Sequence, residues 1–138
     1  MKAERLLSRL EKVKATGSGT WIACCPAHDD KHPSLTVREL EDGRILVHCF
    51  AGCGVEQILI AVGLEFEALF PDKSQEHASS LRRPFPAADI LEALAFELKV
   101  IELVAADMAR GENPSEVDRS RMAVAAERIR EARRFALG

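Results

Sequence analysis

Two short cysteine motifs constrain this chain more than any other feature. Cys25 and His28 are separated by two residues, Cys49 and Cys53 by three, and twenty residues lie between the two pairs. Three thiolates and one imidazole satisfy the tetrahedral N/S preference of a structural zinc site. The spacing therefore predicts one structural Zn²⁺ held by these four residues. No coordination position is left open for water activation.

The cysteine at the first motif has an alternative. Cys24 precedes Cys25 directly, but Pro26 shapes a two-residue turn that favours Cys25 as the ligand. Cys24 beside a zinc site also raises the alternative of a thiol redox switch. Four buried free thiols would be a purely structural alternative, although the polar, glycine-rich surroundings are unlike a core.

Two other histidines compete with His28 as the nitrogen ligand. His32 lies in the loop beyond the first pair. His48 neighbours Cys49, but consecutive strand residues point to opposite faces of a sheet. We expect neither to bind the metal.

The segment between the motifs predicts an antiparallel sheet. Thr20 to Ala23 form a short strand, and the residues of 35–40 and 44–49 alternate as strand residues do. Asp42-Gly43 between the last two strands is a strong hairpin signal. We expect both ligand pairs to sit in turns beside these strands.

Short helices are predicted on both sides of the sheet. Residues 2–14 carry apolar side chains on one face, and Gly17-Ser18-Gly19 ends that helix. Residues 55–62 form a second helix that Gly63 stops, and residues 65–70 add a further turn.

The C-terminal part predicts an antiparallel helical hairpin after a linker at 72–86. Apolar residues repeat at helical spacing from Ile90 to Met108, and Gly111 closes that helix. Asn113-Pro114-Ser115-Glu116 then starts a second helix, with Asn113 as its cap. We expect an α+β fold: a small antiparallel zinc ribbon flanked by short helices (1–71), a linker (72–86) and a helical hairpin (87–138).

Composition limits the classes of function. The 138 residues carry a net charge of −3, so nucleic-acid binding needs a local basic patch rather than a global field. No secretory signal is recognised, and no stretch approaches the roughly 20 apolar residues of a membrane span. We expect a cytoplasmic protein without a membrane partner, in which four cysteines indicate metal binding rather than disulfides.

The motifs resemble the zinc-binding domain of bacterial-type DNA primases, a Cys-His-Cys-Cys zinc ribbon. The resemblance covers about residues 20–70 and is carried, in order, by Cys25-Pro26-x-His28, Lys31-x-Pro33-Ser34-Leu35, His48-Cys49-Phe50 and Cys53-Gly54. The second cysteine pair is spaced by three residues, where cellular primases have two. This spacing is more similar to the phage- and plasmid-borne versions.

The resemblance implies a module that contacts single-stranded DNA. By position, the DNA-facing residues would be those around the hairpin: Lys31, Arg38, Arg44, His48 and Phe50. Cations neutralise phosphates, and an exposed aromatic ring can stack on a base. Scattered surface charge is the alternative, because residues 21–54 hold three basic and five acidic residues, and Phe50 would then pack over the zinc site.

Catalysis is not expected from this chain. The resembled primases hold Mg²⁺ in a separate domain, and the equivalent space here contains a linker and two helices. Asp29-Asp30 and Glu41-Asp42 belong to no recognisable acidic cluster, and we interpret them as solvated turn residues. The prediction is a non-catalytic accessory protein of DNA replication or priming, with a protein-interaction adaptor that does not bind DNA as the alternative.

The helical hairpin is predicted to carry more apolar surface than two helices can bury between them. Three destinations for the surplus are open. It docks on the zinc ribbon, forms a homodimer through residues 87–136, or binds a replication protein such as a primase catalytic subunit, helicase or polymerase.

Overall fold

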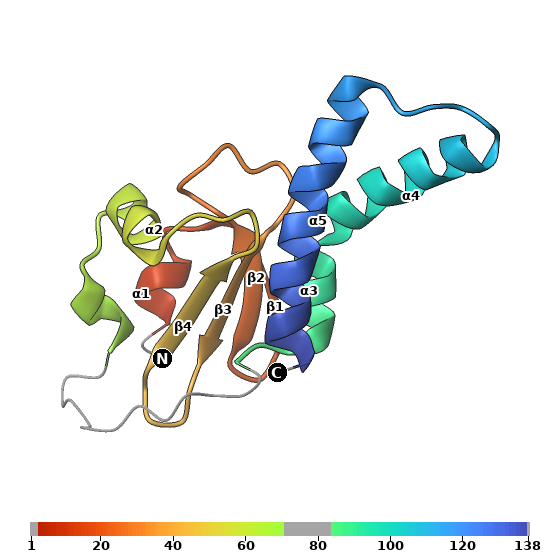
Figure 1. The fold of residues 1–138 in the computed structure, drawn as a ribbon. Helices are drawn as coiled ribbons and strands as arrows, with labels where there is room; N and C mark the ends of the chain where they lie inside the picture. The colour runs from red at the N-terminus through yellow and green to blue at the C-terminus, as the bar shows by residue number, and fades with distance from the viewer. Residues whose placement is uncertain (1–2, 71–83, 138) are drawn as a thin grey trace.

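The computed structural model describes residues 3–70 and 84–137, which form an α+β fold (Figure 1). A four-stranded antiparallel sheet has the order β1-β2-β3-β4 and is followed by helices. The predicted α+β class, with an antiparallel sheet and a C-terminal helical part, is confirmed. The strands are β1 (Glu11–Gly17), β2 (Thr20–Cys24), β3 (Leu35–Glu39) and β4 (Ile45–Cys49). The helices are α1 (Glu4–Leu7), α2 (Val55–Val62), the 3₁₀ helix η1 (Phe66–Leu69), α3 (Ala87–Ala93), α4 (Ala95–Ala109) and α5 (Glu116–Leu137).

The hairpin between β3 and β4 confirms the Asp42-Gly43 signal. Gly43 has a φ of 89°, a conformation that side chains disfavour, and its amide bonds to the Leu40 carbonyl. The pairing places Leu35 opposite Cys49 and Arg38 opposite Leu46. This register decides which face of the sheet each functional residue occupies.

One face of the sheet is covered by its neighbours in sequence. Side chains from β2, β3 and β4 pack there against α1, α2 and η1. The buried members include Leu6, Trp21, Leu35, Val37, Val47, Ile58 and Leu69. We call this aliphatic layer the first face. It lies beside the zinc-ligand turns, because Cys25 and Cys49 belong to the same cluster.

The other face is covered by distant residues of the C-terminal part. Ile22 and Phe50 pack there against α3, α5 and the segment before α3. The buried cover consists of Phe85, Ile90, Ala93, Leu94 and Ala132, and Phe135 packs at its margin. We call this layer the second face. In Figure 1, α5 lies alongside the β1–β2 side of the sheet with α3 beside it. Docking on the zinc ribbon is therefore one destination of the surplus apolar surface.

The N-terminal segment corrects a prediction. The helix expected over 2–14 is only α1, and residues 11–17 form the edge strand β1 instead. All five residues of β2 are buried, so β2 is an internal strand whose backbone needs a partner on both sides. Pairing with β1 through the Gly17–Thr20 turn supplies that partner. Val13, which the helical pattern had assigned to an apolar face, is exposed.

The helical hairpin also departs from the prediction of two long, uninterrupted helices. The first helix breaks at Leu94, where α3 ends and α4 begins. Residues before the break dock on the sheet, whereas α4 contacts α5 and then leads away from both α5 and the sheet (Figure 1). Because the two halves bury their side chains against different surfaces, one straight helix cannot serve both. The second helix is capped by Ser115, whose Oγ accepts the Asp118 amide at 3.1 Å, rather than by Asn113.

The predicted linker at 72–86 falls mostly outside the described residues. Of its last part, Phe85 is buried in the second face, and Pro86 immediately precedes α3. Among the helices that the structure describes, none is both long and apolar enough to cross a bilayer.

Candidate metal centre

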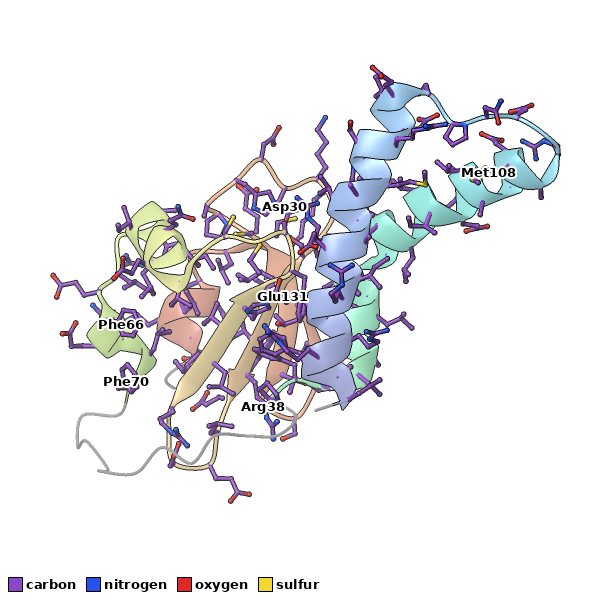
Figure 2. All side chains as sticks on the ribbon, in the orientation of Figure 1. Asp30, Arg38, Phe66, Phe70, Met108 and Glu131 are labelled. Atoms are coloured by element: carbon purple, nitrogen blue, oxygen red, sulfur yellow. The ribbon has the colours of Figure 1, made fainter. Side chains whose placement is uncertain are left out.

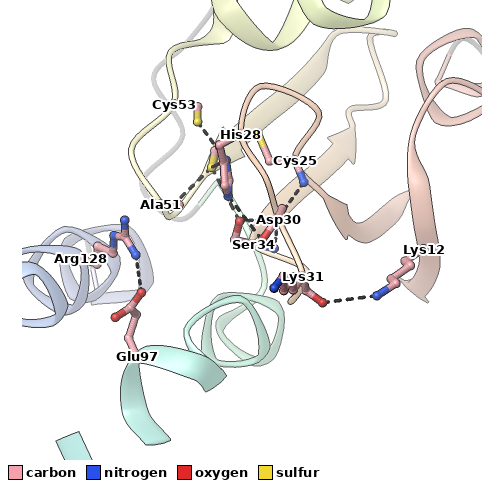
Figure 3. A network of polar contacts seen from close by, with 11 residues as sticks. Lys12, Cys25, His28, Asp30, Lys31, Ser34, Ala51, Cys53, Glu97 and Arg128 are labelled. Atoms are coloured by element: carbon pink, nitrogen blue, oxygen red, sulfur yellow. Dashed lines mark hydrogen bonds and ion pairs between the residues drawn. The ribbon is translucent and has the colours of Figure 1, made fainter. Parts of the chain in front are cut away.

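Four ligand side chains converge where β2 and β4 end. Cys25 follows β2 directly, and His28 lies in the turn after it. Cys49 is the last residue of β4, and Cys53 lies in the loop before α2. In this antiparallel sheet β2 and β4 run in the same direction on either side of β3. Their C-terminal ends therefore lie at the same end of the sheet, and residues distant in sequence meet there (Figure 3).

The geometry fits a tetrahedral ion. One ligand atom from each of the four residues lies within 4.8 Å of all the others. His28 Nδ1 is 3.1 Å from Cys53 Sγ and 3.9 Å from Cys49 Sγ. Ligands of a tetrahedral zinc ion are roughly 3.6–3.8 Å apart, given Zn–S and Zn–N bonds of about 2.3 and 2.0 Å. The group is thus positioned to bind one structural Zn²⁺.

The thiols are electrostatically coupled. A hydrogen bond with the Cys25 thiol, together with bonds from backbone amides, lowers the pKa of Cys49 to about 5 against the opposing effect of burial. The same hydrogen bond and burial raise the pKa of Cys25, and burial with the charge of Cys49 raises that of Cys53. Three thiolates cannot coexist here without a cation, and a zinc ion supplies the compensating charge.

Asp30 organises the first ligand turn. Its Oδ2 accepts the Cys25 amide at 2.7 Å and the Ser34 hydroxyl at 2.8 Å, and its Oδ1 lies 3.4 Å from His28 Nε2 (Figure 3). With Nδ1 facing the thiols, the carboxylate holds the other ring nitrogen and sets the tautomer for binding. The side chain is only 8% exposed. The interpretation of Asp30 as a solvated turn residue was therefore wrong, whereas its neighbour Asp29 is exposed.

The sequence does contain a signal for the role of Asp30 in the ligand turn. An aspartate two residues after a histidine ligand and four before a serine can accept hydrogen bonds from both ends of one turn. The spacing alone does not distinguish it from Asp29, since only the folded turn shows which carboxylate points inward.

The alternative ligands lie elsewhere. Cys24 is buried and is not among the converging groups, and burial raises the pKa of its thiol. A raised pKa suppresses the thiolate that a redox switch needs. The His32 ring stacks on Phe96 at 4.9 Å, and His48 packs against Phe135 at 4.3 Å. The choice of Cys25 and His28 is consistent with this geometry.

Comparison with protein families decides the identity. The model of the CHC2 zinc finger, a zinc ribbon of the DnaG type, matches residues 3–80, more than half of the chain. The chain belongs to the CHC2 zinc finger family. The resemblance to primase zinc ribbons is thereby confirmed, and it implies a primase-related, nucleic-acid-associated role. Comparisons with curated proteins and with solved structures gave no match.

The CHC2 finger does not expose the aromatic ring expected to stack on DNA. Phe50 is 1% exposed and lies beneath Phe85 and Phe135, at ring-centroid distances of 6.4 and 5.8 Å. The premise of an exposed Phe50 was wrong, because the cover comes from helices far along the chain. His48 lies on the same face, 3.4 Å from a carboxylate oxygen of Glu131.

The three predicted cationic contacts of the CHC2 finger differ in accessibility. Arg38 donates from Nη1 to the Pro84 carbonyl at 2.9 Å, and the Arg44 guanidinium pairs with Asp42 at 2.7 Å. Lys31 is exposed in the ligand loop. Of the five residues that the resemblance assigned to DNA, Lys31 is thus the one whose side chain projects most openly into solvent.

Proposed function

We propose that this protein is a non-catalytic accessory protein of DNA priming or replication, which binds single-stranded DNA and a protein of that machinery. The observation that carries the proposal is the family match together with a complete set of four converging ligands. With four protein ligands, zinc acts as a structural centre that shapes a recognition module.

The positions of the acidic residues support a non-catalytic role for this chain. Phosphoryl transfer needs carboxylates that are accessible to Mg²⁺ and nucleotide. Asp30 instead holds the zinc-ligand turn, and Asp42 pairs with Arg44 at the β3–β4 turn. We expect no primer synthesis by the purified chain with any template or divalent metal. Primers that disappear after an Asp→Asn change within this chain would overturn that expectation.

DNA binding is tested with zinc-loaded protein and a fluorescein-labelled oligothymidylate. Anisotropy should show weak binding at low salt that declines steeply toward physiological salt, because counterions are released from the phosphates. Lys31→Ala should weaken binding without loss of zinc, whereas the adjacent Asp29→Ala should not weaken it. A flat titration at low salt would remove the DNA part of the proposal.

The protein partner is proposed to bind the free end of the helical hairpin. Beyond the sheet, α4 and α5 expose large apolar side chains, namely Leu98, Leu103, Met108, Val117 and Val124. Met108, which Figure 2 labels, lies near the tip of α4. We expect Leu103→Glu to abolish binding to a primase catalytic subunit or helicase, and Leu137→Glu at the opposite end of α5 to leave it unchanged. If sedimentation instead shows a dimer that Leu103→Glu dissociates, the partner is a second copy.

The burial of Phe50, together with the packing of the half-buried His48 against Phe135, favours a second candidate. If the sheet face stays covered by α3 and α5, the finger acts as a protein-interaction adaptor in which zinc only stabilises the fold. A pull-down run with and without nuclease separates the two candidates. A partner retained equally after nuclease, from a protein that fails the anisotropy test, would establish the adaptor.

A further inference from the structure

We infer that the solvent-facing side of α5 is a phosphate-binding ridge for single-stranded nucleic acid, in place of the covered sheet face. The inference deepens the proposed function and rests on it. The ridge consists of four arginines that are all exposed, namely Arg119, Arg130, Arg133 and Arg134.

Docking of α5 sets the direction of the ridge. Ala125 and Ala132 are the buried residues of this helix and face the rest of the protein. At 3.6 residues per turn, the four ridge arginines fall within roughly 100° of one another on the opposite side. They extend over about 22 Å of helix axis. Arg130, Arg133 and Arg134 cluster within about one turn, and Arg119 lies roughly 16 Å further along the axis, so the set suits an extended polyanion rather than one small anion.

Two other arginines of α5 are already engaged in ion pairs within the protein. Arg121 and Arg128 point toward α4, where both pair with the buried carboxylate of Glu97. These pairs join the two helices of the hairpin and leave the ridge as a separate set. Figure 3 shows Arg128 meeting Glu97 beside the metal turn.

The ridge side chains remain available to a ligand. Arg130 pairs with Glu127 in a solvent-exposed i,i+3 contact, which is worth little in water. The Arg134 guanidinium lies 5.8 Å from the centre of the Phe135 ring, which orients it without neutralising it. The C-terminal members surround a shallow hollow of about 660 Å³ lined entirely by α5 residues.

Charge distribution favours this surface over the ribbon. Helix α5 holds six arginines against four acidic residues, a surplus of two positive charges. The whole chain has a net charge of −3, so the residues outside α5 carry −5. A polyanion is therefore steered toward α5 and away from most of the rest of the molecule. Guanidinium groups suit phosphate because they offer paired donors and stay charged.

The test compares two triple variants of the zinc-loaded full chain. The ridge variant carries Arg119→Gln, Arg130→Gln and Arg133→Gln. The control removes the same charge from exposed cations elsewhere, through Arg5→Gln, Lys99→Gln and Arg110→Gln. Equal zinc content and equal circular dichroism would establish that both remain folded.

We expect the ridge variant to bind labelled oligothymidylate on the order of tenfold more weakly at low salt, and to lower the salt slope of log affinity by about 2. The control should change either quantity much less. Equal losses of affinity in both variants would show that binding depends only on net charge, and would overturn the proposed ridge. So would wild-type affinity in the ridge variant together with loss of binding in Lys31→Ala, although DNA binding itself would then stand. No binding by the unmodified protein would overturn both proposals.

An acidic protein is the competing ligand for such a ridge. Poly-glutamate of the same charge as the oligothymidylate serves as the competitor. If it displaces the oligothymidylate at equal charge concentration, the surface is not selective for phosphate and the nucleic-acid assignment is wrong. We expect displacement only at large excess of poly-glutamate.

Discussion

The two faces of the sheet are stabilised in different ways. The first face is aliphatic, is covered by α1, α2 and η1 from the same segment, and adjoins the zinc ligands. The second face is rich in aromatic residues and is covered by α3 and α5, which lie more than thirty-five residues beyond β4. The first face therefore belongs to the CHC2 finger as a unit, whereas the second is completed only by the C-terminal part.

The two faces also differ in how directly their packing depends on the metal ion. On the first face, Cys25 and Cys49 are at once zinc ligands and core residues, so metal and packing stabilise one another. On the second face, the rings of Phe50, Phe85 and Phe135 contact one another in a cluster separate from the one that contains the ligand cysteines. Substitutions can test whether the two layers lose stability together or separately.

Removal of a zinc ligand should have the largest effect. Cys25→Ser, His28→Ala, Cys49→Ser or Cys53→Ser should each abolish metal binding and unfold residues 20–55, because structural zinc contributes on the order of 10 kcal/mol. Elemental analysis and circular dichroism measure both losses, and a chelator should reproduce them.

Cys24→Ser is the matched control for that series. Its thiol lies outside the converging group, so zinc should be retained. Zinc lost in Cys24→Ser but retained in Cys25→Ser would reverse the assignment of the first ligand.

Removal of an aromatic ring should uncouple the two faces. Phe85→Ala should cost about 3–5 kcal/mol of stability, because the ring is buried and leaves a cavity. Hydrogen exchange in α5 should accelerate, while zinc stoichiometry and the fluorescence of Trp21 on the first face stay unchanged. Phe66→Ala, at an exposed ring, is the control and should change little. Loss of zinc from Phe85→Ala would mean that the two layers form one cooperative unit.

Asp30→Ala should weaken metal affinity without abolishing it. The change removes the acceptor that holds the Cys25 amide and His28 Nε2, and partners of this kind are typically worth about 10–100-fold in affinity. Competition against a chromophoric chelator measures the change. Asp29→Ala, one residue earlier and exposed, should bind zinc as the unmodified protein does. Equal affinity in both variants would refute a positioning role for Asp30.

The smallest effect is expected at the β3–β4 turn, which belongs to neither layer. The Arg44 amide, with help from its guanidinium, lowers the pKa of the Asp42 carboxyl. A lowered pKa means that the stabilisation is present above the ordinary aspartate range and is lost as pH falls through the folded-state value. Arg44→Ala should return the pKa only part of the way, since the backbone amide remains. An NMR titration of Asp42 that shows full return would contradict this.

Local features of the sequence predicted the metal site and the β3–β4 turn well. The ligand spacing, the Asp42-Gly43 pair and Gly63 each act within a few residues, and each is found where expected. Gly63 ends α2 with a φ of 70°, as a glycine at this position allows. For such features the folded environment adds little to what the neighbouring residues already determine.

Features that depend on distant partners could not be predicted in the same way. Strand β1 is exposed along most of its length, so it lacks the apolar alternation that marks a strand, and only its pairing with β2 defines it. Phe50 follows a zinc ligand in a polar turn, and no neighbouring residue in the sequence indicates that α5 packs over it. The break at Leu94 likewise reflects two docking surfaces and not a proline or glycine.

The large separation in sequence between Phe50 and Phe135 has a consequence for biosynthesis. A ribosome makes the chain from the N-terminus, so the CHC2 finger can close around zinc while α5 has yet to be translated. Throughout that interval Ile22, Phe50 and His48 face solvent, or whatever lies nearby in the cell. The nascent finger therefore passes through a stage with an open aromatic surface, and synthesis of the last helix closes it.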